Sequence, residues 1–133
     1  MGYIASNLAA IGAATVAGLL FGLLYLRLVS RLPPATAGEA FGFGVLAAVA
    51  EFWLACILAG AVILAPRTEA GPWTMALASA GVIWVGFVLP TLLVSERLRG
   101  VRLGNALLDG AHWLAVMLIQ AAVLNAVGLV KPV

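Results

Sequence analysis

Charged residues are scarce in this sequence. They make up 9% of its 133 residues, while hydrophobic residues make up 65%, and soluble globular proteins carry roughly a quarter charged residues. This scarcity excludes a soluble globular domain. It also excludes a nucleic-acid-binding protein, because the few basic residues are scattered instead of forming a patch. The composition predicts a multi-pass membrane protein whose first partner is the lipid bilayer.

Cysteine and histidine each occur once, as Cys56 and His112. One cysteine excludes an intramolecular disulfide, and the two residues together supply too few ligands for a usual zinc site. A haem would need the histidines of two copies. The chain also lacks a P-loop, a GxGxxG motif and the GxSxG motif of serine hydrolases. We therefore expect no metal, no cofactor and no enzymatic activity.

Four apolar stretches are each long enough to cross about 30 Å of hydrocarbon, which takes roughly 20 helical residues. They lie at about 7–26, 40–64, 73–94 and 105–130. The stretches occupy nearly the whole chain, so the sequence predicts an all-α fold and a single domain built as an antiparallel four-helix transmembrane bundle. The first stretch has no basic segment before it and is too long for a cleaved signal, so it is interpreted as a retained span.

Basic residues are distributed unevenly between the connections. The first and third connections lie on the same side and hold Arg27, Arg31, Arg97, Arg99 and Arg102. The opposite side holds only Arg67 and Lys131. Since cytoplasmic connections carry the excess of basic residues, both termini are predicted to lie outside the cytoplasm.

Local signals mark several element boundaries. Thr36 and Glu39 have the spacing of a capping box at the start of the second span. Pro90 lies near the end of the third span, where its missing N–H predicts a kink. In the first span, small residues recur every four positions, at Ala10, Ala14, Gly18 and Gly22. Such a stripe allows close helix packing, and we expect it to support a homo-oligomer or a larger membrane complex.

Polar residues inside the spans are the candidate functional groups. Glu51 shares one helix face with small residues, namely Gly44, Ala48, Ala55 and Ala59, which predicts that it points into the bundle. The fourth span carries a polar stripe on one face, formed by Asn105, Asp109, His112 and Gln120. Ionisable groups at this depth are functional candidates. A relay from Arg99 or Arg102 through Asp109 and His112 to Glu51 would suit proton transfer.

Motifs in the second half of the chain resemble a family of small bacterial four-span inner-membrane proteins catalogued as a domain of unknown function. The similar residues are Trp84, Gly86, Phe87 and Pro90 late in the third span, Asp109, Gly110 and Leu114 in the fourth, and more loosely Gly22 and Tyr25 in the first. The resemblance implies a four-span fold in the bacterial inner (cytoplasmic) membrane. It implies no catalytic residue.

Two functions from different classes remain open at this point. The first is a small proton-linked transporter or permeation pathway, in which Glu51 titrates and Asp109 and His112 act as relay or gate. The second is a non-catalytic structural or accessory subunit of a larger membrane complex. In the second case the same polar residues form interhelical hydrogen bonds that specify packing.

Overall fold

The structure is a computed structural model that describes residues 2–29, 36–66 and 70–131. The described residues form helices and contain no strand. Arg31 and Arg67, which entered the prediction of orientation, lie outside the described residues. The elements are α1 (Gly2–Ser6), α2 (Leu8–Val29), α3 (Ala37–Leu64), α4 (Pro72–Ile83), the π-helical segment η1 (Trp84–Val88), α5 (Leu89–Leu98) and α6 (Leu103–Val127).

Four helical stretches are long and apolar enough to cross a membrane: Leu8–Val29, Ala37–Leu64, Pro72–Leu98 and Leu103–Val127. The predicted all-α fold with four spans is therefore confirmed. The helices begin and end within a few residues of the predicted limits, since apolar runs locate spans well but helix ends poorly. The third span is continuous but has three parts, α4, η1 and α5.

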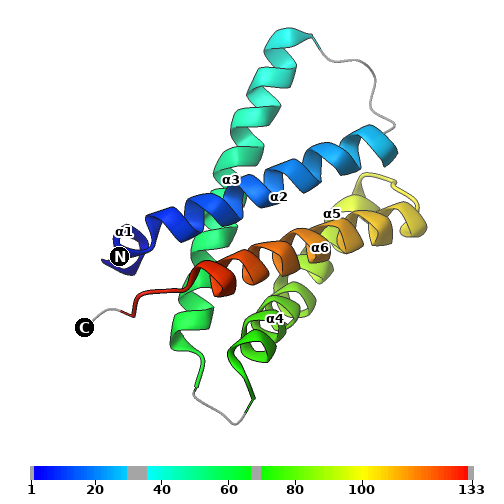
Figure 1. Cartoon of the computed structure of the whole chain (residues 1–133). Coiled ribbons are helices and arrows are strands. Elements are labelled where there is room, and N and C mark those ends of the chain that lie inside the picture. The colour runs from blue at the N-terminus through cyan, green and yellow to red at the C-terminus, as the bar shows by residue number, and fades with distance from the viewer. Residues whose placement is uncertain (1, 30–35, 67–69, 132–133) are drawn as a thin grey trace.

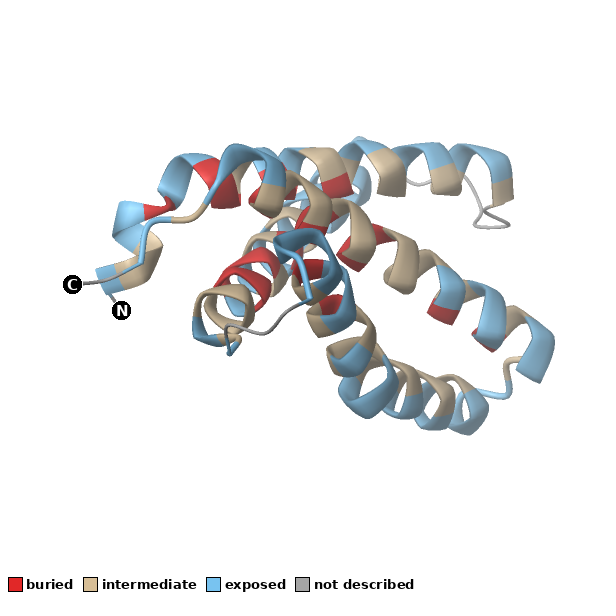
Figure 2. Ribbon diagram, turned by 60° about the horizontal axis from the view of Figure 1, so that its bottom comes forward, coloured by how far each residue is buried: buried red, intermediate tan, exposed pale blue. Residues whose placement is uncertain are grey.

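α2 and α6 run antiparallel and side by side through the middle of the molecule, and they share the most extensive contact between any two helices (Figure 1). α3 crosses α2 steeply, while α4 and α5 pack along α6. Figure 2 shows that the buried residues lie on the inner sides of these helices. α6 is thus the central helix, in contact with every other span.

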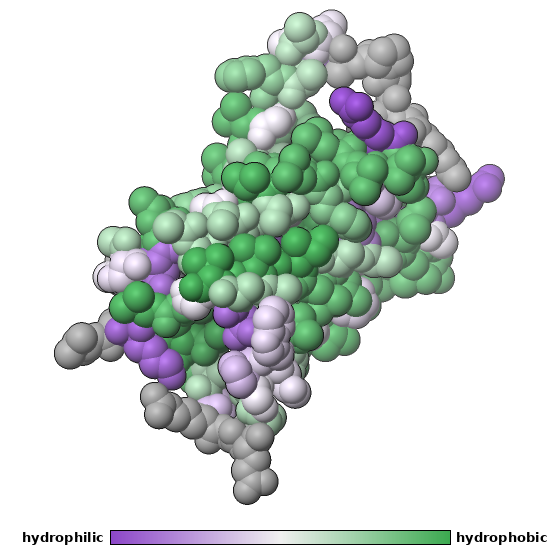
Figure 3. All heavy atoms as spheres, viewed as in Figure 1, coloured by the Kyte–Doolittle hydropathy of each residue, from purple (hydrophilic) through white to green (hydrophobic). Residues whose placement is uncertain are grey.

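The core is built from small and aliphatic side chains. Its fully buried members include Ile11, Leu58, Met117 and Leu124. Most other large apolar side chains point outward, and the space-filling view shows an apolar body with hydrophilic residues gathered toward its ends (Figure 3). An apolar exterior suits a lipid environment, because lipid tails are as apolar as the side chains that face them.

The capping box at the start of α3 is confirmed. The Glu39 amide donates to Thr36 Oγ1 at 3.3 Å, and the Thr36 amide donates to Glu39 Oε2 at 2.8 Å. These two bonds satisfy amide groups that a helix start otherwise leaves unpaired.

The expected kink at Pro90 takes the form of a π-helical turn. In η1 the Leu89 amide donates to the Trp84 carbonyl five residues back, and Thr91 Oγ1 donates to the Phe87 carbonyl at 2.6 Å. A proline cannot donate to the carbonyl four residues before it. The wider turn and the threonine hydroxyl rearrange the hydrogen bonds around that missing donor.

A hydrogen-bond clamp joins the two ends of the chain. Asn7 lies between α1 and α2 and is buried. Its amide donates to the Val130 carbonyl at 2.9 Å, and its side-chain oxygen accepts from the Val130 amide at 2.7 Å. Asn7 was not predicted as a structural residue, because nothing local in the sequence pairs it with a residue more than a hundred positions away.

The N-terminal half of α3 lies largely outside the bundle, where Figure 1 shows it extending beyond α2. Phe41 is 75% exposed and Gly44 is also exposed, whereas Glu51, Ala55 and Ala59 are buried. The predicted interior face of this span is therefore correct for its C-terminal half and wrong at Gly44. α3 crosses the bundle instead of running along it, so its first turns meet no other helix.

Candidate functional site

Glu51 lies at the crossing of α3 with α2 and α6, and only 3% of its surface is exposed. Gln120 on α6 is fully buried beside it. The Gln120 amide donates to Glu51 Oε2 at 2.7 Å and to the Glu51 backbone carbonyl at 3.1 Å. No Lys or Arg among the described residues forms an ion pair with Glu51. The carboxyl group is thus buried and bound by a neutral amide.

Two glycines of α2 provide the space that this carboxyl group occupies. A Cβ atom at Gly18 would collide with Glu51 Oε2 and would lie 3.0 Å from Gln120 Nε2. A Cβ atom at Gly22 would lie 3.9 Å from both Glu51 Oε1 and His112 Cε1. The absence of side chains at these positions lets α3 and α6 bring their polar groups against the α2 backbone.

Because Glu51 Oε1 and His112 Cε1 lie at the same distance from one point beside Gly22, they are separated by at most twice that distance. Both side chains thus border Gly22, but no hydrogen bond or ion pair joins them among the described residues. His112 Nδ1 and Gln120 Oε1 are buried and have no hydrogen-bond partner among the described residues. Both are therefore polar atoms of the interior that the described residues leave unpaired.

His112 also packs against aromatic rings of α2. Its ring stacks on Tyr25, with centroids 4.1 Å apart, and on Phe21, with centroids 5.6 Å apart. The Tyr25 hydroxyl donates to Asp109 Oδ1 at 2.6 Å. Five side chains, which we call the polar row, therefore follow one another along the α2–α6 interface: Gln120, Glu51, His112, Tyr25 and Asp109.

The polar row includes most, but not all, of the candidates from the sequence. Asn105 is half-buried near the start of α6, and its side chain forms no hydrogen bond with a described residue. The proposed link from Arg99 or Arg102 to Asp109 is wrong. Arg99 pairs with Glu96 at 3.4 Å, and Arg102 is exposed at the start of α6. Asp109 instead accepts a hydrogen bond from Tyr25 of α2.

The small-residue stripe of α2 lies inside the chain. Ala10 and Ala14 are buried in the core, and Gly18 and Gly22 receive Glu51. Within the chain the stripe packs against α3 and α6, so it gives no direct support to contact between copies. An oligomer remains a prediction without this support.

Tyr25 is the member of the polar row that the sequence reasoning missed as a functional group. It was visible in principle, because it lies three residues after Gly22 and continues the helix face marked by the small residues. An isolated tyrosine near a span end is usually assigned to the membrane interface, which explains why its partner Asp109 was not foreseen.

No group of three or more His, Cys, Asp or Glu residues that could hold a metal ion occurs in the described part of the chain. Comparison with protein-family models, with curated proteins and with solved structures finds no match to this chain. The resemblance to the four-span family of unknown function therefore remains a prediction.

Proposed function

We propose that the chain is a small proton-linked transporter or permeation pathway, and that Glu51 is the group that takes up and releases the proton. The observation that carries the proposal is a carboxyl group buried at the crossing of three helices, with a neutral amide as its hydrogen-bond donor. A charged side chain in the middle of a bilayer costs at least about 2.5 to 3.5 kcal/mol. Burial thus favours the uncharged carboxyl group, which requires a proton.

The neighbours of Glu51 support proton exchange. A protonated carboxyl group is a hydrogen-bond donor, and the Gln120 side chain that bonds to Glu51 also carries an amide oxygen without a hydrogen-bond partner among the described residues. The ionisable groups along the α2–α6 interface are His112, Tyr25 and Asp109. They lie between Glu51 and the end of α6 that carries the basic third connection; a hydrogen bond joins Tyr25 to Asp109, and His112 contacts Tyr25 by ring stacking.

The test is Glu51→Gln in liposomes that contain the purified protein and a pH-sensitive dye. Glutamine keeps the size of the side chain and still accepts from Gln120, so the fold is expected to persist, while Glu51-dependent proton flux is lost. Glu39→Gln is the matched control, because Glu39 is an exposed acid on the same helix and glutamine also suits its place in a capping box. Undiminished proton flux in Glu51→Gln would refute the proposal.

The second candidate is a non-catalytic structural or accessory subunit. The observation in its favour is the double hydrogen bond from Gln120 to Glu51, which ties α6 to α3. Buried polar groups of this kind specify helix packing in membranes. In that case Glu51→Gln and His112→Ala should change thermal stability or the retention of partner proteins, while no transport depends on either residue.

We further propose the bacterial inner membrane as the location of the chain and a homo-oligomer or larger complex as its assembly. The first rests on the resemblance to the four-span family and on the count of basic residues, and the second on the small interior of a single bundle. Native mass spectrometry of protein extracted gently from its own membrane tests both the assembly and the presence of larger partners.

A further inference from the structure

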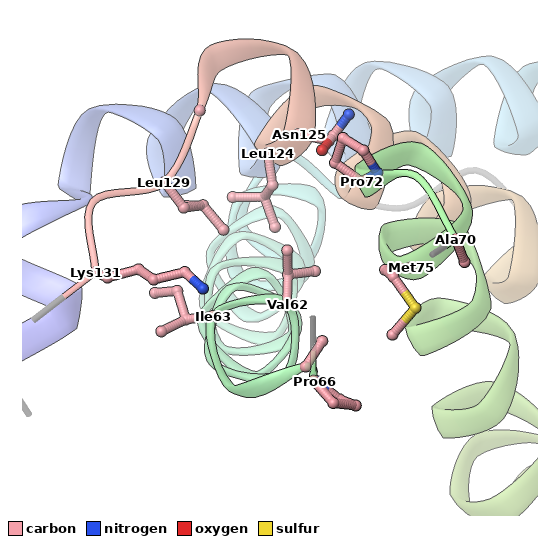
Figure 4. Close-up of a pocket in the computed structure, with 12 residues that line it drawn as sticks. Val62, Ile63, Pro66, Ala70, Pro72, Met75, Leu124, Asn125, Leu129 and Lys131 are labelled. Atoms are coloured by element: carbon pink, nitrogen blue, oxygen red, sulfur yellow. The ribbon is translucent and has the colours of Figure 1, made fainter. Parts of the chain in front are cut away.

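A pocket of about 410 Å³ lies at the end of the bundle opposite to Asp109, between the C-terminal end of α3, the start of α4 and the C-terminal end of α6 (Figure 4). This volume falls within the range of small-molecule sites, roughly 300 to 1,000 Å³. Its walls are mostly apolar and include Val62, Ile63 and Leu129. The pocket can therefore take the apolar body of a small molecule.

Two hydrogen-bond donors accompany this apolar lining. They are the Lys131 ammonium and the Asn125 amide, and Figure 4 shows the Lys131 side chain extending toward Ile63. Neither side chain forms a hydrogen bond or ion pair within the described ranges. Lys131 is the only charged side chain among the described residues that line the pocket, and its ammonium group complements a negatively charged ligand.

Leu124 connects the pocket with the polar row. It lines the pocket and is fully buried, and it lies four residues after Gln120, on the same face of α6. The Gln120 amide in turn donates a hydrogen bond to Glu51 Oε2. Four residues of α6, about 6 Å along the helix axis, therefore separate Leu124 of the pocket from Gln120, the residue that donates to Glu51.

We propose that this pocket binds an apolar monocarboxylate and is the substrate site of the proton-linked transporter. The Lys131 ammonium binds the carboxylate, and the apolar wall receives the hydrocarbon. The assignment of a substrate rests on the proposed function, whereas the binding site can be tested without it. A proton on Glu51 and a monoanion in the pocket together carry no net charge, which lowers the electrostatic cost of moving both through hydrocarbon.

The experiment measures saturable binding of radiolabelled octanoate to the protein in phosphatidylcholine nanodiscs. We expect excess unlabelled octanoate to displace the label, whereas octan-1-ol and octylamine, which have the same chain but no carboxylate, should not. Absence of saturable binding, or equal displacement by octan-1-ol, would overturn the proposal because the charge of the ligand would then be irrelevant.

Variants locate the site. Lys131→Gln is expected to weaken octanoate binding about tenfold, equivalent to 1.4 kcal/mol, while Lys131→Arg keeps the charge and most of the affinity. Val62→Trp should fill the pocket and abolish binding without altering either donor. If both Lys131→Gln and Val62→Trp bind octanoate as well as the unchanged protein, the pocket is not the site.

Two further outcomes separate this inference from the proposed function. Octanoate binding without any Glu51-dependent proton flux would retain the site and reject proton-linked transport. Glu51-dependent flux without octanoate binding would retain transport and reject the site. If phosphatidylglycerol in the nanodiscs abolishes the binding that phosphatidylcholine permits, the pocket belongs to an anionic lipid, and the monocarboxylate proposal is wrong.

Discussion

Replacing Gly18 by alanine is the most direct test of how α2 receives Glu51. The added Cβ atom would overlap Glu51 Oε2 and crowd Gln120 Nε2. Overpacking of this kind costs about 1 to 3 kcal/mol, and loss of the Gln120–Glu51 bond adds about 0.6 kcal/mol, the average for interhelical bonds in membranes. The higher helix propensity of alanine offsets this by stabilising α2 by up to about 1 kcal/mol. We expect a net destabilisation of roughly 0.6 to 3.6 kcal/mol.

Gly12 provides the matched control on the same helix, because a Cβ atom there would meet nothing within 4 Å. Gly12→Ala should therefore be neutral or stabilising by up to about 1 kcal/mol. The measurement is equilibrium unfolding of the purified variants in mixed micelles, followed by tryptophan fluorescence.

A double-mutant cycle makes the reasoning more specific. When Glu51 is first replaced by alanine, the atom that collides with the new Cβ is gone, so Gly18→Ala should cost much less than in the unchanged protein. If Gly18→Ala and Gly12→Ala have the same effect, or if the cost of Gly18→Ala is independent of Glu51, the contact between Gly18 and the carboxyl group does not determine the packing.

Two other changes test single hydrogen bonds. Tyr25→Phe removes the hydroxyl that donates to Asp109 but keeps the ring that stacks on His112. It should lower the free energy of unfolding by about 0.6 kcal/mol, at most about 1.7. An unchanged unfolding curve would show that the hydrogen bond contributes nothing to stability. Asn7→Ala leaves both backbone groups of Val130 without their partner. Hydrogen exchange at the Val130 amide should therefore become faster, while exchange in the middle of α6 stays the same. Equal protection of Val130 in the variant and the unchanged protein would contradict the clamp.

The sequence was sufficient to predict the spans because each is a long apolar run, and the capping box because its residues are neighbours in the chain. Contacts between helices were harder to predict. The polar face of α6 was evident from its periodicity, but periodicity does not say which helix faces it. Asp109 was therefore assigned to an arginine nearby in sequence, whereas the structure pairs it with Tyr25 of α2.

The glycines illustrate the same limit. A line of small residues on a helix predicts that another group packs closely against its backbone, and that group is usually a second helix. At Gly18 the approaching group is the Glu51 side chain. Likewise, Pro90 predicted a disturbed helix, but whether the missing bond produces a sharp bend or a π-helical turn depends on neighbouring side chains such as Thr91.

The length of α3 ties the site to the thickness of the membrane. Its 28 residues span about 42 Å, well beyond a hydrocarbon core of about 30 Å, so the helix fits only by tilting or by lifting its first turns toward the headgroups. Glu51 lies near its midpoint, at the crossing with α2. A thinner bilayer would increase the tilt of α3 and a thicker one would reduce it. Because the hydrogen bond from Gln120 to Glu51 joins α6 to α3, we expect its geometry to depend on the lipids that surround the protein.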